Sequence, residues 1–250
     1  MSLIQSIQDT YADLHTWLYT QMVEPLLFHA GAMAWAEDLF DGTEWFMLGV
    51  IQILIIAIVF RTWERINPAE SQINARSYVR TDMLYTMIHR LGLFHGLFFI
   101  LFSSLFFYLS GVLHDWRFER FNVEGWIPGV TTIPIVSFLI YLVILDFIDY
   151  WYHRASHRFH WWWQLHALHH SQTRMTAWSD DRNHIVDDVM RAMVFAFFAL
   201  IFGVPPGQFI FLVVVGQLVQ SWQHANLKID LGPAKYLLVS PLFHRYHHAV

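Results

Sequence analysis

Histidines crowd one short segment of the sequence at a spacing that suits metal binding. Six of the chain's 16 histidines lie between residues 153 and 170. On a helix, His153 and His157 stand at i and i+4, so both imidazoles project from one face. A second set follows at i, i+3 and i+4: His166, His169 and His170. Neutral imidazole is the commonest metal ligand near neutral pH, and clustering imidazoles in an apolar setting is costly unless something binds them. The segment therefore predicts a metal site.

Composition narrows the class of protein and of metal site. With 56% hydrophobic and 14% charged residues, the chain lies outside the ordinary soluble range and is typical of a membrane protein. The absence of cysteine excludes disulfides, thiolate zinc sites and Cys-ligated iron–sulfur clusters or haem. Every glutamate lies at or before Glu124, which excludes an H-E-x-x-H zinc protease helix in the histidine-rich half. No Glu-x-x-His pair exists for a carboxylate di-iron bundle, and no basic patch predicts nucleic-acid binding.

Three apolar runs are the expected membrane spans. The first, residues 45–60, is short, but flanking aromatic residues or tilt can complete it. The second and third, 91–113 and 127–148, have full length. A polar loop over residues 61–80 carries arginines after an N-terminus that has none, so the positive-inside rule puts this loop on the cytoplasmic side. The third span then delivers the histidine segment to the same side.

Two shorter apolar runs, 189–204 and 208–222, predict a helical hairpin. They are separated by Gly-Val-Pro-Pro-Gly, and proline and glycine break a helix and favour a tight reversal. Each run is shorter than the roughly 20 residues of a standard span. We therefore expect the hairpin to dip into the membrane from the cytoplasmic face and to return both of its ends to that face.

The expected fold is all-α: an integral membrane helical bundle of about three full spans plus the Pro-broken hairpin, with a histidine-rich metal cap on the cytoplasmic side. Residues 1–44 are expected to form short helices near the membrane surface, without a secretory signal peptide. Residues 45–250 are expected to form a single membrane-embedded domain, with the histidine motifs between 153 and 248.

This topology brings ten histidines to one side of the membrane, at or beyond helix ends. One metal takes about four to six ligands, so ten imidazoles fit two metals. His160 interrupts the spacing and is expected not to bind metal, and the five scattered histidines are expected to be ordinary core or interface residues. The candidate ligands are His153, His157, His166, His169, His170, His184, His224, His244, His247 and His248.

Aspartates near these histidines are candidates for orienting them. Asp149 precedes His153 by one helical turn on a polar stripe of the third span, where ionisable residues usually serve a function. We expect it to hold a ligand histidine through the far ring nitrogen. Asp187 and Asp188 could do the same near His184, or they could simply cap a helix and solvate the interface.

The motifs resemble the histidine boxes of the fatty acid hydroxylase and sterol desaturase superfamily. The matching elements, within residues 134–250, are His153-x-x-x-His157, His166-x-x-His169-His170, His224-Ala-Asn226 and His244-x-x-His247-His248. Members are membrane-embedded, non-haem di-iron enzymes that use O2 and external electrons to hydroxylate or desaturate lipids. The resemblance implies two iron ions, with zinc possible in isolated protein, and it puts the ten candidate histidines on the family's ligand positions.

Two features depart from the family pattern. The family's Arg-x-His element is matched at His184, but the proline and glutamate that often follow it are Ile185 and Asp187 here. Family chains usually continue past the third box, whereas this sequence ends two residues after His248, so it could be a fragment of a longer protein.

The expected function is that of an O2-dependent di-iron lipid hydroxylase or desaturase. Its substrate would come from the bilayer and its electrons from a separate donor protein. Sterol, fatty acyl, carotenoid and ether-lipid oxidation fit the boxes equally. A membrane metal transporter would need ligands near the bilayer midplane. A zinc-dependent hydrolase would need an open coordination position and a general base, and a purely structural metal site would have no open position.

Overall fold

The computed structural model describes residues 3–71, 76–127, 129, 133–204 and 206–249, and the regular structure in these ranges is helical, without a β-strand. This confirms the all-α class. The α-helices are α1 (Leu3–Leu18), α2 (Glu24–Ala30), α3 (Ala36–Leu54), α4 (Arg61–Ile66), α5 (Arg76–Arg90), α6 (Leu93–Asp115), α7 (Val123–Trp126), α8 (Pro134–Arg158), α9 (His160–His166), α10 (Ile185–Ile201), α11 (Pro206–His224) and α12 (Pro241–His248). Short π- and 3₁₀-helical turns adjoin them: η1 (Tyr19–Val23), η2 (Met33–Trp35), η3 (Ile55–Phe60), η4 (His169–Ser171) and η5 (Gly232–Tyr236).

Three helical stretches of the described chain are long and apolar enough to cross a membrane: Met33–Ile66, Leu93–Asp115 and Pro134–Arg158. They confirm the three expected spans. The first is longer than the apolar run at 45–60 because the helix continues through its flanking residues, giving 34 residues in all. The boundary expected between residues 44 and 45 therefore falls inside this helix.

The polar connection after the first span is mostly helical rather than a loop, which corrects the sequence interpretation. The first helix continues as α4, and α5 then packs back along α3. Hydrophobic periodicity gave no signal for α5 because its buried face is polar: Asp82, Thr86 and Arg90, spaced by four residues, are at most 3% exposed. The crossing is close, since a Cβ atom at Gly49 of α3 would lie 1.7 Å from the carbonyl oxygen of Arg90.

The predicted hairpin is formed by α10 and α11. Its tip contacts the connection between α6 and α8, where the backbone N–H of Phe121 donates to the oxygen of Ile201 and that of Gly203 donates to the oxygen of Phe121, both at 2.9 Å. The tip of the hairpin thus lies near the C-terminal end of α6 and the N-terminal end of α8.

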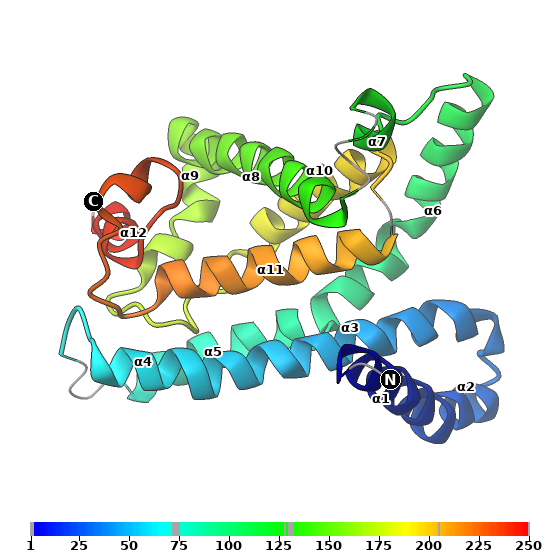
Figure 1. The fold of residues 1–250 in the computed structure, drawn as a ribbon, viewed down its shortest axis with the longest axis horizontal. Coiled ribbons are helices and arrows are strands. Elements are labelled where there is room, and N and C mark those ends of the chain that lie inside the picture. Colours follow the sequence, from blue (N-terminus) through cyan, green and yellow to red (C-terminus); the bar gives the residue numbers. More distant parts are fainter. Residues whose placement is uncertain (1–2, 72–75, 128, 130–132, 205, 250) are drawn as a thin grey trace.

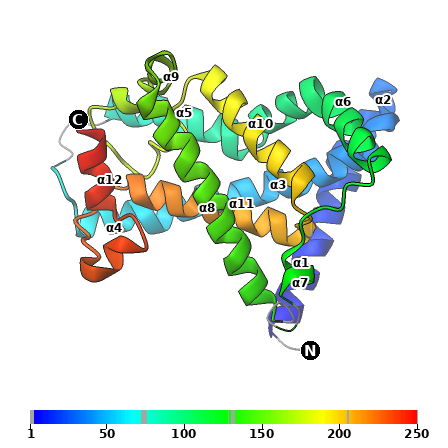
Figure 2. The same ribbon diagram turned by 90° about the horizontal axis from the view of Figure 1, so that it is seen from above.

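The helices are arranged so that the histidine-bearing segments meet at one end. Figure 1 shows α11 between α8 on one side and α3 on the other, and these helices are in contact. Figure 2 shows α8 crossing α11 at a steep angle. The tip of α4, the helix α9 and the helix α12 lie together at one end of the molecule, whereas α1 and α2 lie at the other (Figure 1). We call the first of these the histidine end.

An apolar core ties the first span to the loops at the histidine end. It consists of Ile56, Ala177, Trp178, Ala225 and Leu227, each at most 5% exposed. The last four flank the segments that carry candidate histidines, so burying them against Ile56 fixes those segments to the N-terminal helices. A second core of Val123, Tyr141, Leu145, Phe198 and Leu212 joins α7, α8, α10 and α11.

Candidate metal centre

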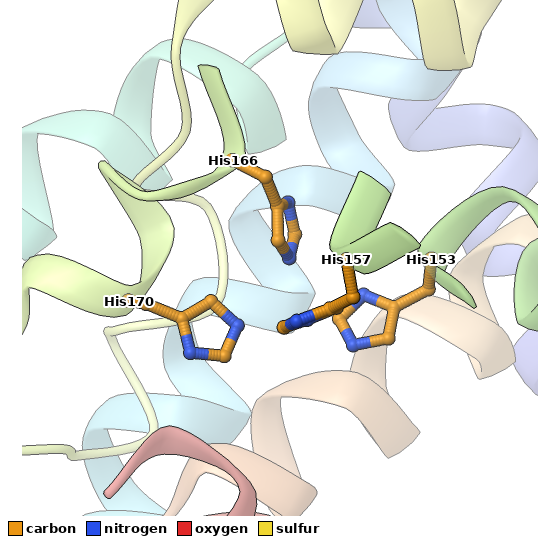
Figure 3. A group of neighbouring side chains, drawn as sticks. All are labelled: His153, His157, His166 and His170. Atoms are coloured by element: carbon orange, nitrogen blue, oxygen red, sulfur yellow. The ribbon is translucent and has the colours of Figure 1, made fainter. Parts of the chain in front are cut away.

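The first histidine group consists of His153, His157, His166 and His170. One ring nitrogen from each lies within 4.8 Å of the others. Figure 3 shows the four rings pointing toward a common centre. This is the arrangement expected of residues that share a metal ion.

Local structure explains how these four meet. His153 and His157 occupy the last turns of α8 on one face, with ring centroids 4.7 Å apart. Phe159 then adopts an extended conformation that ends α8 and begins α9. The chain bends there, and His166 at the end of α9 returns to a ring-centroid distance of 4.8 Å from His153.

The second histidine group consists of His169, His224, His244 and His248. Its Nε2 atoms form a chain of 3.1 Å contacts, from His169 to His224, on to His244 and on to His248. His224 ends α11, and α12 supplies the last two. The start of α12 is fixed by Ser240, whose side chain accepts a hydrogen bond from the backbone N–H of Phe243.

The first i, i+3, i+4 trio is divided between the two groups, and the second trio has two members in the second group and one that faces the first. In the first trio, His166 and His170 belong to the first group and His169 belongs to the second. In the second trio, His244 and His248 belong to the second group, while His247 faces the first, with its Nε2 2.8 Å from Nε2 of His153. The rings of His170 and His248 stack at 4.2 Å between centroids, which joins the two groups.

The donor set fits two metal ions. Two nitrogens bound at about 2.1 Å to one ion, at tetrahedral or octahedral angles, would stand about 3.0–3.4 Å apart, which matches the 3.1 Å contacts of the second group. In the first group, Nε2 of His166 and both ring nitrogens of His170 are buried without a hydrogen-bond partner in the described chain. Buried nitrogens of this kind are costly unless they bind an ion.

Burial favours the neutral, metal-binding form of several imidazoles at this site. Burial, followed by the neighbouring His166, lowers the pKa of His170 to about 3. Burial also lowers the pKa of His169 and of His248 well below the usual value, and the nearby ring of His224 adds to the effect. These side chains are therefore unprotonated at neutral pH, as ligation requires.

Asp187 orients His166. Its Oδ2 lies 3.0 Å from Nδ1 of His166, and its Oδ1 accepts from the Tyr152 hydroxyl at 2.6 Å and from the Trp162 indole N–H at 2.9 Å. Burial raises the pKa of the Asp187 carboxyl, but these hydrogen bonds, that of His166 first, outweigh burial and lower the pKa below its usual value. The ionised carboxylate keeps the proton of His166 on Nδ1, so that Nε2 faces the group.

Asp149 does not contact a histidine, contrary to the sequence-based expectation. It forms a two-pronged ion pair with Arg191 of α10 at 2.8 and 2.9 Å, and it accepts from Gln220 of α11 at 2.8 Å. A carboxylate inside an apolar bundle is costly without a partner, and the neighbouring helices provide an arginine and an amide at the right depth.

His184 belongs to neither group. It precedes α10, and its Nδ1 accepts a hydrogen bond from the backbone N–H of Val186 at 3.2 Å, which caps the helix. Asp188 likewise points away from His184 and lies 3.0 Å from Nε2 of His89. His160 is also outside both groups, as expected.

The sequence interpretation missed several residues that hold the site. Tyr152 and Trp162 had no signal beyond their aromatic character. Glu64 of α4 is 2% exposed, and its Oε1 accepts from the backbone N–H groups of Ala177 at 2.8 Å and Asn226 at 2.9 Å. One carboxylate thereby ties together two loops that flank candidate ligands, and its distance of more than a hundred residues from them leaves no local pattern.

A cavity of about 520 Å³ opens beside the first group. It is lined by His157, Arg158, His160, Trp163 and His247. The cavity gives the first group contact with the surroundings at the end of α8. In the second group, His169, His224 and His248 are at most 8% exposed, whereas His244 is partly exposed.

Comparison with known proteins finds relatives of the part of the chain that carries both histidine groups. The fatty acid hydroxylase family model matches residues 138–250. The ornithine lipid hydroxylase OlsE of Rhizobium tropici is 30% identical over 108 residues, which are 43% of this chain and 33% of that protein. Alkylglycerol monooxygenase is 31% identical over 140 residues in Danio rerio (56% of this chain, 30% of that protein) and 29% identical over 104 residues in Homo sapiens (42% and 23%).

The matched segments span about a third or less of these relatives, and no solved structure matches the chain. The family match covers α8 to α12 except for the first residues of α8, and it includes both histidine groups and His247. Residues 138–250 of this chain match the fatty acid hydroxylase family and are similar in sequence to lipid hydroxylases.

Proposed function

We propose that this protein is a membrane-bound, non-haem di-iron oxygenase that hydroxylates a lipid. The observation that carries the proposal is the pair of four-histidine groups at one end of an apolar helical bundle. The proposed ligands are the eight histidines of the two groups and His247. His184, proposed from the family pattern, remains a candidate only if the loop before α10 rearranges when metal binds.

The overall reaction has a simple balance. A C–H bond, one O2, two electrons and two protons give an alcohol and water. Two irons bound by imidazoles would supply the oxidising power that no amino-acid side chain has. The electrons would come from a separate donor protein.

The chain's own residues would hold and orient the ligands. Asp187 fixes the tautomer of His166, and Trp162 and Tyr152 fix Asp187. The stacked rings of His170 and His248 keep the two groups adjacent. The cavity beside His157 would give dioxygen and substrate access to the first group.

The relatives narrow the substrate class. Their names specify an ornithine lipid and alkylglycerols, both of which combine a polar head with a long alkyl chain. We propose that this chain acts on a lipid of that general form and that it inserts oxygen rather than forming a double bond. Product analysis would separate the two, because hydroxylation adds 16 mass units and desaturation removes two.

Several observations favour this proposal over the rival functions. A transporter would hold its ligands at the middle of the spans, whereas the groups lie at the histidine end, where α8 and α11 finish. A hydrolase would need a free general base, but Asp187, the carboxylate bonded to a ligand histidine of the first group, is already engaged by three side chains.

The test is metal analysis of the purified chain, followed by oxygen consumption with lipid and a chemical reductant. We expect two irons per chain after reconstitution and hydroxylated lipid that depends on O2. Absence of bound iron together with no product after reconstitution would overturn the proposal.

We also propose that the histidine end faces the cytoplasm, since the arginine-bearing α4 lies there. The chain has no cysteine, so single cysteines can be placed freely. A thiol reagent that cannot cross the membrane should label Lys228→Cys only in inverted vesicles and Arg117→Cys only in intact cells. The reverse pattern would reverse the orientation.

A further inference from the structure

The loop between the first trio and α10 is held by helices from the N-terminal half of the chain. Thr86 of α5 donates to the backbone oxygen of Trp178 at 3.1 Å, and the Ser179 hydroxyl donates to Asp82 of α5 at 3.0 Å. All four residues are at most 5% exposed. The loop follows His169 and His170 directly, so the position of the metal centre depends on segments outside the family match.

Arg90 is the central contact of this interface. Its side chain is fully buried, and the three nitrogens of the guanidinium together donate to α3, α11 and the loop. Nε donates to Asp181 at 2.9 Å, Nη1 to Gln52 of α3 at 2.8 Å, and Nη2 to Asp180 at 2.8 Å and to Ser221 of α11 at 3.1 Å. One side chain thereby joins α3, α5, α11 and the loop. Such a buried cation is stable only because two carboxylates compensate its charge.

One of the two carboxylates continues to the metal centre. Oδ1 of Asp180 lies 3.5 Å from Nδ1 of His224, and the same nitrogen is 2.8 Å from the backbone oxygen of Gln220. Two acceptors therefore face Nδ1, which keeps the proton there and leaves Nε2 free to point at His169 and His244. Asp181, the neighbouring carboxylate, binds Arg90, and among the described residues it has no hydrogen bond or ion pair with a histidine of either group.

We propose that Arg90 and Asp180 are positioning residues for the second histidine group: Arg90 fixes Asp180, and the charge of Asp180 reinforces the Nδ1–H tautomer and the orientation of His224, which the backbone oxygen of Gln220 also favours. This inference rests on the proposed metal-binding function. It makes the N-terminal half of the chain a part of the metal centre rather than only a membrane anchor.

The adjacent aspartates provide a matched pair of variants. Asp180→Asn keeps an oxygen for Arg90 but removes the charge beside His224, whereas Asp181→Asn makes the same chemical change where no histidine is touched. Removing such an outer carboxylate typically weakens metal affinity about 10–100-fold. We expect that loss for the second site alone in Asp180→Asn. Asp181→Asn weakens one of the two carboxylate pairs of Arg90 but leaves the carboxylate beside His224 in place, so we expect a clearly smaller loss there.

The measurement is competition of the full-length protein with a calibrated chelator for Zn²⁺, with metal counted per chain. Two double variants assign the loss to a site. In a His244→Ala background, where the second site is already removed, adding Asp180→Asn should cause no further loss of metal affinity. Combining it with His157→Ala should weaken the remaining site about 10–100-fold.

Three outcomes separate the possibilities. Equal losses in Asp180→Asn and Asp181→Asn would show that the interface is merely structural and would overturn the inference, as would unchanged affinity in Asp180→Asn. A wild-type protein that binds no metal would overturn the proposed function instead. If Asp180→Asn does not fold, the tautomer of His224 in the metal-free wild type decides: nitrogen NMR should show the proton on Nδ1, and a proton on Nε2 would refute the inference.

Discussion

The two histidine groups differ in how they are enclosed and in which part of the chain supports them. In the first group, His157 is exposed and lies beside the cavity, and the supporting Asp187 comes from the same matched region, residues 138–250. In the second group, His169 and His224 are at most 5% exposed, and the support comes through α5. The difference teaches that access and rigidity are divided between the groups: the first can meet small molecules, and the second is fixed inside the protein.

The largest effect should follow from removing one ligand of each group. His166→Ala and His169→Ala should each reduce bound metal from two ions to one and abolish hydroxylation, because each group needs its four imidazoles. His15→Ala is the control, since His15 lies in α1, where it contacts the backbone oxygen of Phe40 at 3.0 Å and packs against the Phe40 ring. If either ligand variant keeps both metals, the division into two groups is wrong.

Gly49→Ala tests how far the second group depends on the N-terminal half. A Cβ atom there would overlap the carbonyl oxygen of Arg90, so α3 and α5 must separate. We expect a loss of about 1–3 kcal/mol or more in stability, and weaker metal binding at the second site than at the first. Thermal unfolding in detergent and metal counting check this.

Gly111→Ala in α6 is the matched control, because nothing lies within 4 Å of its added Cβ. It should gain up to about 1 kcal/mol from helix propensity and leave the metal content unchanged. Equal destabilisation of both glycine variants would mean that the crossing of α3 and α5 is not the cause.

Asp187→Asn should weaken the first group selectively. Tyr152 and Trp162 can still hydrogen-bond to the amide oxygen, but the charge behind His166 is lost. We expect about 10–100-fold weaker metal binding at the first site. Asp149→Asn is the comparison: it should lower the unfolding temperature by weakening the pair with Arg191 and leave both metal affinities intact. A loss of metal in Asp149→Asn would restore the role first expected for Asp149.

The smallest effect is expected at His184. His184→Ala should cost about 0.5–2 kcal/mol through the loss of a helix cap, with two metals still bound. Retention of only one metal would instead make His184 a ligand and require the loop before α10 to move.

Local pattern was enough to predict much of this fold. The three spans and the hairpin follow from runs of apolar residues and from the Gly-Val-Pro-Pro-Gly break. α5 could not be found in this way, because Asp82, Thr86 and Arg90 form a buried stripe that is polar. The buried stripe of α5 is stabilised by ion pairs and hydrogen bonds to distant residues, and hydropathy does not report such pairing.

By itself, the sequence determined that histidines at i, i+3 and i+4 would gather near helix ends as candidate metal ligands, because residue type and helical period are local properties. Only the tertiary structure decided how each trio is divided between two groups, why His184 lies outside them, and which carboxylate serves which partner. Asp187 meets His166 and Asp149 meets Arg191 because the packing of α8, α9 and α10 brings those pairs together. Partner choice of this kind depends on distances through space, and spacing along the chain does not contain them.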